Sequence, residues 1–308
     1  MTPRNGNLPS RTAVSRMTPS SYSNQRKDHL ILFSPAKINL FFRVLHRRSD
    51  DYHEIASLYQ AITLGDHLTL TLSHEDLLTS NNPHLPTDRT NLIYRSLDLF
   101  RKKTGQHFPV HFHVEKNIPI EAGLGGGSSN AATAMWALNA LSNNPVSNEE
   151  LATWVSEFSS DAPFFFSEGT AYCSGRGEIL EKIEPLAKTS LWIAKPVEGL
   201  STPLVFKNCE PALFKNRDPR NALIQALSGA LDYFNDLEVP AFRLLPKLLE
   251  LKEQLLHLGF SQVVMTGSGT AFFCIGTISE APSIPGVTFY PVSFQQRDAH
   301  GWYSEILQ

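Results

Sequence analysis

Three consecutive glycines followed by two hydroxyl side chains form the part of the chain best suited to chemistry. Gly125, Gly126 and Gly127 stand directly before Ser128 and Ser129, and the residues after them favour a helix. Glycine lets a bulky anion approach the backbone amides, and the start of a helix adds unpaired N–H groups and a positive dipole end. The spacing predicts a phosphate-binding loop, with a triphosphate as the first ligand to consider.

Two common phosphate motifs do not fit this loop. Gly127 occupies the position where the pattern G-x-x-x-x-G-K-[ST] needs a lysine. Counting from Gly123 and Gly125 places Ser128 where the dinucleotide pattern G-x-G-x-x-G needs its third glycine. Pro119 also disfavours a long strand running into the loop. A glycine-rich surface turn is the remaining alternative, which the helix-forming run after the glycines disfavours.

The sequence indicates where the helix after the loop begins and ends. Ser129 or Asn130 is expected to cap it, residues 131–141 include strong helix formers, and Pro145 follows its end. The loop is therefore expected to lie at a helix N-terminus.

Two polar side chains interrupt an otherwise apolar strand near the start of the folded chain. Alternation over residues 34–44 places Lys37 and Asn39 on one face and Ile38 and Phe42 on the other. A lysine in such a strand is either an edge residue whose ammonium reaches water or a buried functional cation.

A lone carboxylate stands before a run of aromatic residues. Asp161 precedes Pro163 and the three phenylalanines at 164–166. Taken by itself, an aspartate at such a junction is most often a turn or cap residue.

These segments together resemble the motifs of the GHMP kinases, a family of small-molecule kinases that has no Walker lysine. Matching motifs near residues 34, 52, 119, 161, 202 and 266 occur in the family's order and span nearly the whole folded chain. The phosphate loop carries one additional glycine. Ser159 and Ser160 replace a glycine-containing pair in the family pattern Gly-x-Asp-x-Pro-x-Phe, a small-for-small change that leaves Asp161 and Pro163 in place.

The resemblance implies phosphoryl transfer from ATP, with Mg²⁺ as the accompanying ion. Asp161 would accept the proton of the substrate hydroxyl, or only orient it, and Lys37 would pair with Asp161 and the transferring group. The amides of 125–129 would hold the β- and γ-phosphates, and Ser128 or Ser129 would help position Mg²⁺. Lys116 would lie near adenine. The predicted ATP-binding residues are Lys116, Pro119, Ile120, Glu121, Ala122, Gly123, Leu124, Gly125, Gly126, Gly127, Ser128 and Ser129.

The resemblance also implies a cytidine diphosphate-linked methylerythritol as substrate, phosphorylated on its 2-hydroxyl in the non-mevalonate isoprenoid pathway. Tyr52 and His53 suit a cytosine, because an imidazole can hydrogen-bond its edge and an aromatic ring can stack on it. Phe206 would be a second aromatic contact, and Asp51 replaces a glycine that the family generally has before this pair. The predicted substrate-binding residues are Asn39, Tyr52, His53, Thr202, Phe206, Gly267, Ser268 and Gly269.

Two other functions stay open. One is a different GHMP kinase acting on mevalonate phosphates or homoserine, which Tyr52, His53 and Phe206 disfavour. The other is a catalytically silent relative that binds nucleotide as a sensor, which the presence of both Lys37 and Asp161 disfavours.

The fold that the resemblance implies is α+β with two domains and the active site between them. A ribosomal protein S5 domain 2-like, ATP-binding domain would cover 30–188, and a ferredoxin-like, substrate-binding domain would cover 189–308. Within the second, apolar periodicity predicts one helix over 241–258 that ends at Gly259, and a hairpin over 263–275 around a Gly-Ser-Gly turn.

Composition narrows the class of protein. A net charge of -3 over 308 residues disfavours a nucleic-acid partner, and no apolar run has the length needed to cross a bilayer. Cys173, Cys209 and Cys274 form no C-x-x-C pair, which disfavours a disulfide framework or a structural zinc site. His111 and His113 are expected to lie on the wet face of a strand rather than on zinc. We expect a cytoplasmic monomer or homodimer with a small-molecule substrate.

Residues 1–29 differ in composition from the rest. They contain several arginines among Ser, Thr, Asn and Pro, and no acidic residue precedes Asp28. We expect a disordered leader, either a start assigned too early with Met17 as initiator, or a transit peptide that would place the protein in the plastid stroma.

Overall fold

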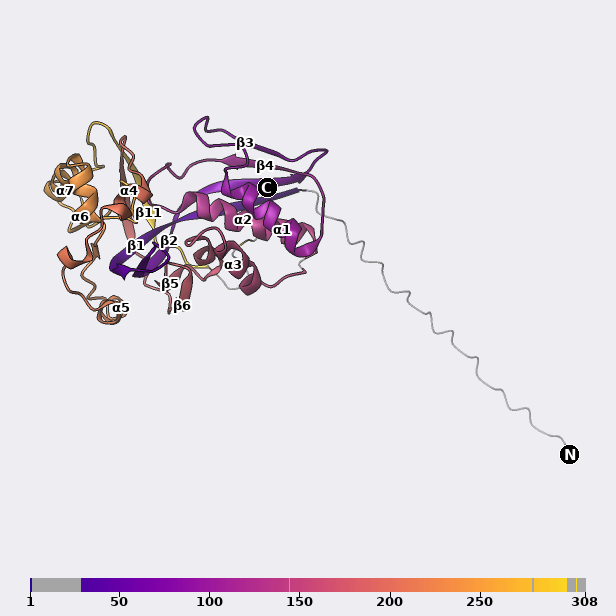
Figure 1. Cartoon of the computed structure of the whole chain (residues 1–308), viewed down its shortest axis with the longest axis horizontal. Helices are drawn as coiled ribbons and strands as arrows, with labels where there is room; N and C mark the ends of the chain where they lie inside the picture. The colour runs from indigo at the N-terminus through magenta and orange to yellow at the C-terminus, as the bar shows by residue number, and fades with distance from the viewer. Residues whose placement is uncertain (2–28, 144, 279, 298–302, 304–308) are drawn as a thin grey trace.

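The computed structural model describes residues 1, 29–143, 145–278, 280–297 and 303. The expected leader lies almost wholly outside the described residues. Two β-sheets form the framework, and strands β1 and β2 run between the group of helices α1, α2 and α3 at one end and α5, α6 and α7 at the other (Figure 1). No helix in the described ranges is long and apolar enough to span a membrane.

The first sheet is built on a long antiparallel pair, β1 (His29–Arg47) and β2 (His53–Leu72). Both strands are buried along most of their length. The strand order is β3-β4-β2-β1-β8, and β5 pairs with both β2 and β6. The remaining strands of this sheet are β3 (Leu77–Ser80), β4 (Val110–Glu115), β5 (Thr170–Ser174), β6 (Ile179–Lys182) and β8 (Phe234–Asn235).

A β-bulge in β1 changes which side chains reach the site. Asn39 pairs with Tyr59, but Phe41 pairs with Leu58, so Leu40 is an extra residue and the alternation shifts by one. Phe42 therefore faces the cleft described below rather than sharing the face of Ile38, and the simple alternation predicted for this strand is wrong beyond Asn39.

Helices α1 (Leu92–Thr104), α2 (Gly126–Leu141) and α3 (Asn148–Ser156) cover one face of this sheet with the short 3₁₀ helix η1 (Ala162–Phe166). Asn91 caps α1 and Ser147 caps α3 through side-chain hydrogen bonds. The predicted cap of α2 is wrong. Helix α2 begins at Gly126 with Gly125 as its cap, so Ser129 lies inside it.

The second sheet has the strand order β11-β7-β10-β9 and is antiparallel throughout. Its strands are β7 (Ser190–Pro196), β9 (Gln262–Met265), β10 (Phe272–Ile275) and β11 (Val287–Ser293). Numbered along the chain this order is 4-1-3-2, which is the ferredoxin-like arrangement. The mixed helix and sheet content agrees with the α+β class that the motifs predict.

The helix predicted over 241–258 is divided in two. Helix α6 (Glu238–Leu244) ends before Pro246, and α7 (Lys247–His257) begins after it. Proline donates no backbone hydrogen bond and forces the residue before it out of the helical region, and Leu245 has φ -139° and ψ 82°. The other helices of this half are α4 (Thr202–Lys207), η2 (Pro211–Leu213) and α5 (Pro219–Leu227).

The last described residues return to the first sheet. Phe294 forms an isolated bridge with Ile62, and the amide of Gln295 donates to the carbonyl of Ala61. The hydroxyl of Tyr303 donates to the carbonyl of Phe165 at 3.1 Å, so the Tyr303 side chain contacts η1.

Candidate active site

A cleft of about 890 Å³ lies where the glycine loop, the ends of β1 and β2, helix α4 and the 267–268 turn meet. All but three of the residues predicted to bind ATP or substrate or to take part in catalysis line it. The three exceptions are Asn39, Ser129 and Gly269, which lie behind the lining. Residues from six sequence motifs therefore converge on one cavity.

The glycine loop has a backbone that only glycine adopts easily. Gly123 and Gly125 have φ of +78° and +70°, in the left-handed region. A Cβ on Gly125 would lie 3.0 Å from Cγ of Lys37 and 3.1 Å from Cζ of Phe165. Gly125 thus lets the loop lie directly on Lys37, whose own amide donates to the carbonyl of Leu124 at 3.0 Å.

The start of α2 defines which amides can bind an anion. The first amides of a helix have no partner within it, and here these belong to Gly126, Gly127 and Ser128. The amide of Ser129, which is in the predicted set, instead donates to the carbonyl of Gly125 at 2.9 Å within the helix.

The three predicted residues behind the lining hold the site together. The hydroxyl of Ser129 is buried, 3.0 Å from that of Ser34. Asn39 accepts a hydrogen bond from the Lys37 ammonium at 3.0 Å. A Cβ on Gly269 would lie 2.1 Å from the amide nitrogen of Gly123, so Gly269 allows the Gly-Ser-Gly turn to pack on the phosphate loop.

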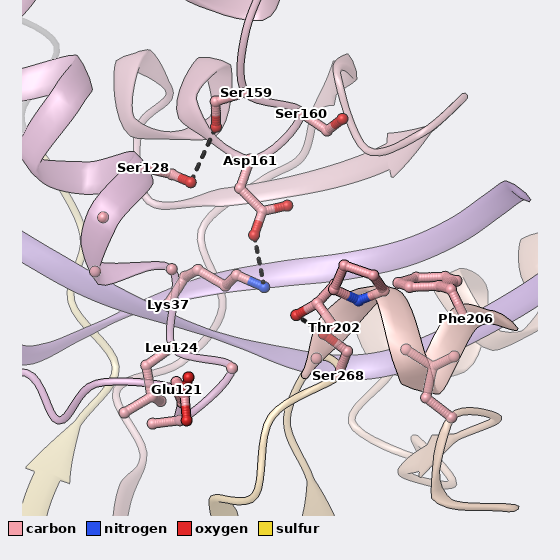
Figure 2. Close-up of a pocket in the computed structure, with 18 of the residues that line it drawn as sticks. Lys37, Glu121, Leu124, Ser128, Ser159, Ser160, Asp161, Thr202, Phe206 and Ser268 are labelled. Atoms are coloured by element: carbon pink, nitrogen blue, oxygen red, sulfur yellow. Dashed lines mark hydrogen bonds and ion pairs between the residues drawn. The ribbon is translucent and has the colours of Figure 1, made fainter. Parts of the chain in front are cut away.

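Lys37 and Asp161 form an ion pair at the centre of the cleft (Figure 2). The ammonium Nζ lies 3.3 Å from Oδ2 of Asp161 and 4.5 Å from the centre of the Tyr59 ring. The hydroxyl of Tyr59 donates to Oδ1 of Asp161 at 3.0 Å. The Lys37 side chain is 3% exposed and that of Asp161 is 30% exposed, so the carboxylate is the member of the pair that opens onto the cleft.

Tyr59 stays a neutral hydrogen-bond donor beside this carboxylate. Burial raises the pKa of its phenol well above the ordinary value, and the negative charge of Asp161 raises it further. The phenol is therefore protonated at neutral pH and remains a donor to Asp161.

A second ion pair lies beneath the phosphate loop. The ammonium of Lys116 is 2.7 Å from Oδ2 of Asp66 and donates to the carbonyl of Ile118 at 2.7 Å. The fully buried Asp66 also accepts from the amides of Asn117 and Ile118 and from the side chain of Asn130. Burial lowers the pKa of Lys116, against the opposing effect of Asp66. The pair joins β2 to both ends of the loop.

The other end of the cleft carries aromatic rings. His53 and Phe206 lie with ring centres 5.4 Å apart and planes 32° apart. Tyr52 is half exposed, and the Arg176 guanidinium lies 4.9 Å from its ring centre. Burial lowers the pKa of His53, and the charge of Arg47 lowers it further. Asp51 has φ +66°, in the left-handed region that favours glycine.

Sequence reasoning missed several lining residues, above all Tyr59, Ser159 and Arg176. Tyr59 reads as an ordinary strand aromatic, and only its pairing with Asn39 in the β1–β2 register places it by the catalytic pair. The resemblance treats Ser159 and Ser160 as a small-for-small replacement of a glycine-containing pair, yet the hydroxyl of Ser159 donates to that of Ser128 at 2.9 Å.

The two histidines of β4 lie away from the cleft. The rings of His111 and His113 both hydrogen-bond the hydroxyl of Thr79 at 2.8 Å. Among the described residues, no group of three His, Cys, Asp or Glu side chains could hold a metal ion.

Comparison with known proteins identifies the family. Residues 91–169 match the model of the GHMP kinases N terminal domain, and 211–284 match that of the GHMP kinases C terminal domain. A 4-diphosphocytidyl-2-C-methyl-D-erythritol kinase of Protochlamydia amoebophila (strain UWE25) is 48% identical over 89% of this chain and 93% of its own length. The chloroplastic enzyme of that name from Arabidopsis thaliana is 41% identical over 90% of this chain and 76% of its own length.

A solved structure agrees with these relatives. A crystal structure of 4-(cytidine 5'-diphospho)-2C-methyl-D-erythritol kinase superposes with a TM-score of 0.72 at 33% identity, covering 86% of this chain and 98% of that one. The chain therefore belongs to the GHMP kinases and, among them, to the 4-diphosphocytidyl-2-C-methyl-D-erythritol kinase family.

Proposed function

We propose that this kinase transfers the γ-phosphoryl group of ATP to the 2-hydroxyl of 4-diphosphocytidyl-2-C-methyl-D-erythritol in the non-mevalonate isoprenoid pathway. Family membership supports the reaction. The observation that carries the proposal within this chain is the Lys37–Asp161 pair, which lies 3.3 Å apart in the same cleft as the free amides of the glycine loop.

Asp161 is the proposed acceptor of the substrate proton. Transfer needs the hydroxyl in line with the γ-phosphate, and its proton must move to a nearby base as the new bond forms. Tyr59 and Lys37 hold one oxygen of Asp161 each, which fixes the plane of the carboxylate toward the cleft. Lys37 also supplies positive charge where the transferring group becomes more negative.

The start of α2 is the proposed site of the ATP phosphates. The free amides of Gly126, Gly127 and Ser128 and the helix dipole all favour an anion there. Lys116 is proposed to lie near adenine, at the side of the loop that Asp66 holds.

Mg²⁺ fits this site as an ion held chiefly by ATP. Magnesium in kinases usually binds phosphate oxygens and water with one or two protein oxygens, and the described residues contain no all-protein cage. Of the two serines predicted to help, Ser129 is bonded inside the core and Ser128 lines the cleft. Ser128 is therefore the residue proposed to lie beside the ion, which would neutralise phosphate charge.

His53 and Phe206 are the proposed contacts of the cytosine. Their rings lie together at the end of the cleft away from the glycine loop, and a neutral imidazole can accept and donate hydrogen bonds at a base edge. Tyr52 and Arg176 form the exposed edge beside them. Thr202 and Ser268, whose hydroxyls are 2.7 Å apart, would face the part of the substrate between cytosine and the reacting hydroxyl.

The assay that tests the proposal measures ADP release. We expect turnover with 4-diphosphocytidyl-2-C-methyl-D-erythritol at a kcat/KM at least about 100-fold above that with mevalonate phosphate or homoserine. Equal turnover with either of those would indicate another GHMP kinase. Nucleotide binding without turnover of any of them would indicate a silent sensor.

The cellular location and the oligomeric state are further parts of the proposal. We propose a cytoplasmic monomer or homodimer, with the plastid stroma as the alternative location, since the relatives include bacterial and chloroplastic enzymes. Light scattering after size-exclusion chromatography measures the oligomeric state directly.

A further inference from the structure

The segment before Asp161 is tied to the phosphate loop by one hydrogen bond between side chains. The hydroxyl of Ser159 donates to the hydroxyl oxygen of Ser128 at 2.9 Å, and Figure 2 shows these two groups pointing toward one another above the Lys37–Asp161 pair. Both serines line the cleft. The bond joins residues 31 positions apart in the sequence.

Ser159 is the donor in this bond, and a third group donates to the same hydroxyl oxygen. The amide of Ala162, at the start of η1, donates to the Ser159 hydroxyl oxygen at 3.3 Å. A backbone N–H can only donate, so Ser159 accepts there and its own proton is available for Ser128. The Ser128 oxygen then accepts from Ser159, and the single Ser128 proton must point elsewhere.

We propose that Ser159 is a positioning residue that turns the Ser128 hydroxyl into a directed hydrogen-bond donor toward the ATP phosphates. The relay runs from the Ala162 amide through Ser159 to Ser128, and each group donates to the next. Ser128 lies in the first turn of α2, next in sequence to the free amides of Gly126 and Gly127. A donor already oriented before binding loses no rotational freedom when the anion arrives.

The relay also connects the proposed ATP-binding loop to the segment that carries the proposed base. Ser128 belongs to the element that holds ATP, and Ala162 directly follows the proposed base Asp161. The inference rests on the proposed binding of ATP at this loop, and its test is arranged so that the two can fail separately.

The test compares Ser159→Ala, Ser159→Gly and Ser159→Thr with Ser156→Ala. Ser156 is in α3, outside the lining, and its hydroxyl bonds the carbonyl of Thr153. Affinity for the non-hydrolysable analogue adenylyl imidodiphosphate is measured by calorimetry, and KM for ATP and kcat by ADP release. Loss of one hydrogen bond predicts about fivefold weaker binding in the alanine and glycine variants, with kcat changed less than about twofold. Ser159→Thr and Ser156→Ala are expected to bind as the wild type does.

A double-mutant cycle decides whether Ser159 acts through Ser128. In a Ser128→Ala background, adding Ser159→Ala is expected to change analogue affinity less than about twofold. The same fivefold loss in both backgrounds would overturn the proposal, as would an effect on kcat alone, which would mean that Ser159 only supports η1. Binding of the analogue is measured without the acceptor substrate. A lack of turnover with the cytidine substrate would therefore count against the proposed function without affecting this binding result.

Discussion

The phenol of Tyr59 donates a 3.0 Å hydrogen bond to the same carboxylate, Asp161, that Lys37 contacts from the other side. Tyr59 is almost fully buried, whereas Asp161 opens onto the cleft. A buried donor that stays protonated gives the carboxylate one fixed orientation without adding a charge.

Tyr59→Phe removes this donor and keeps the ring over which Lys37 lies. We expect kcat to fall about 3- to 10-fold, because Asp161 gains rotational freedom, while KM for ATP stays within about twofold. Steady-state ADP release measures both constants. Tyr290→Phe, on β11 outside the cleft, is the matched control. An unchanged kcat in Tyr59→Phe would mean that Lys37 alone orients the carboxylate.

Gly125→Ala tests the close approach of the loop to Lys37. The new methyl would stand 3.0 Å from the Lys37 side chain at a φ of +70°, so we expect a loss of about 1–2 kcal/mol in unfolding free energy and a large loss of kcat. Gly105→Ala has the same strain, at φ +71°, with no atom within 4 Å, and should lose stability but keep activity. Urea denaturation and turnover separate the two effects. Equal kcat in both variants would contradict the packing argument.

Asp66→Asn tests the ion pair beneath the loop. Removing one partner leaves the Lys116 charge buried, so we expect a loss of about 3 kcal/mol in unfolding free energy and weaker ATP binding. Asp98→Asn breaks an exposed pair with Arg89 and should lose less than about 1 kcal/mol. Chemical denaturation with and without ATP measures both quantities. A similar small loss in the two variants would show that the buried pair is dispensable.

Stability should depend on pH through His53. Burial and the charge of Arg47 lower its folded pKa, so between that value and the ordinary pKa near 6.5 the unfolded chain binds a proton that the folded chain does not. The unfolding free energy therefore rises with pH across this window. The contribution of His53 to stability is lost as the pH falls through it. His53→Gln should show a shallower slope in the range just below the ordinary pKa of about 6.5. Identical slopes in wild type and variant would remove His53 as the cause.

Local sequence patterns predict where the main motifs lie in the chain, but they do not predict how these motifs pack against one another. Spacing alone predicted that Lys37 and Asn39 project together, and they do. The bulge at Leu40 could not be predicted, because it depends on the register of β1 with β2. Tyr59 was missed for the same reason, since nothing near it in sequence distinguishes it from a core aromatic.

Two errors could have been avoided with the sequence alone. Pro246 lies inside the stretch predicted as one helix, and the backbone restriction on the residue before proline would have divided it. Gly125, which has no side chain to clash at a left-handed φ, was a better cap for α2 than Ser129. The hydrogen bond of Ser159 depends on a contact between distant segments, and no local rule predicts it.

Turnover by Asp161→Asn tests the central claim most directly. Asparagine preserves the shape of the side chain and removes the proton acceptor, so ADP release in the presence of 4-diphosphocytidyl-2-C-methyl-D-erythritol should fall at least about 100-fold in kcat, with analogue affinity within a few-fold of wild type. Wild-type kcat in the Asp161→Asn variant would contradict the assignment of Asp161 as the group that accepts the proton.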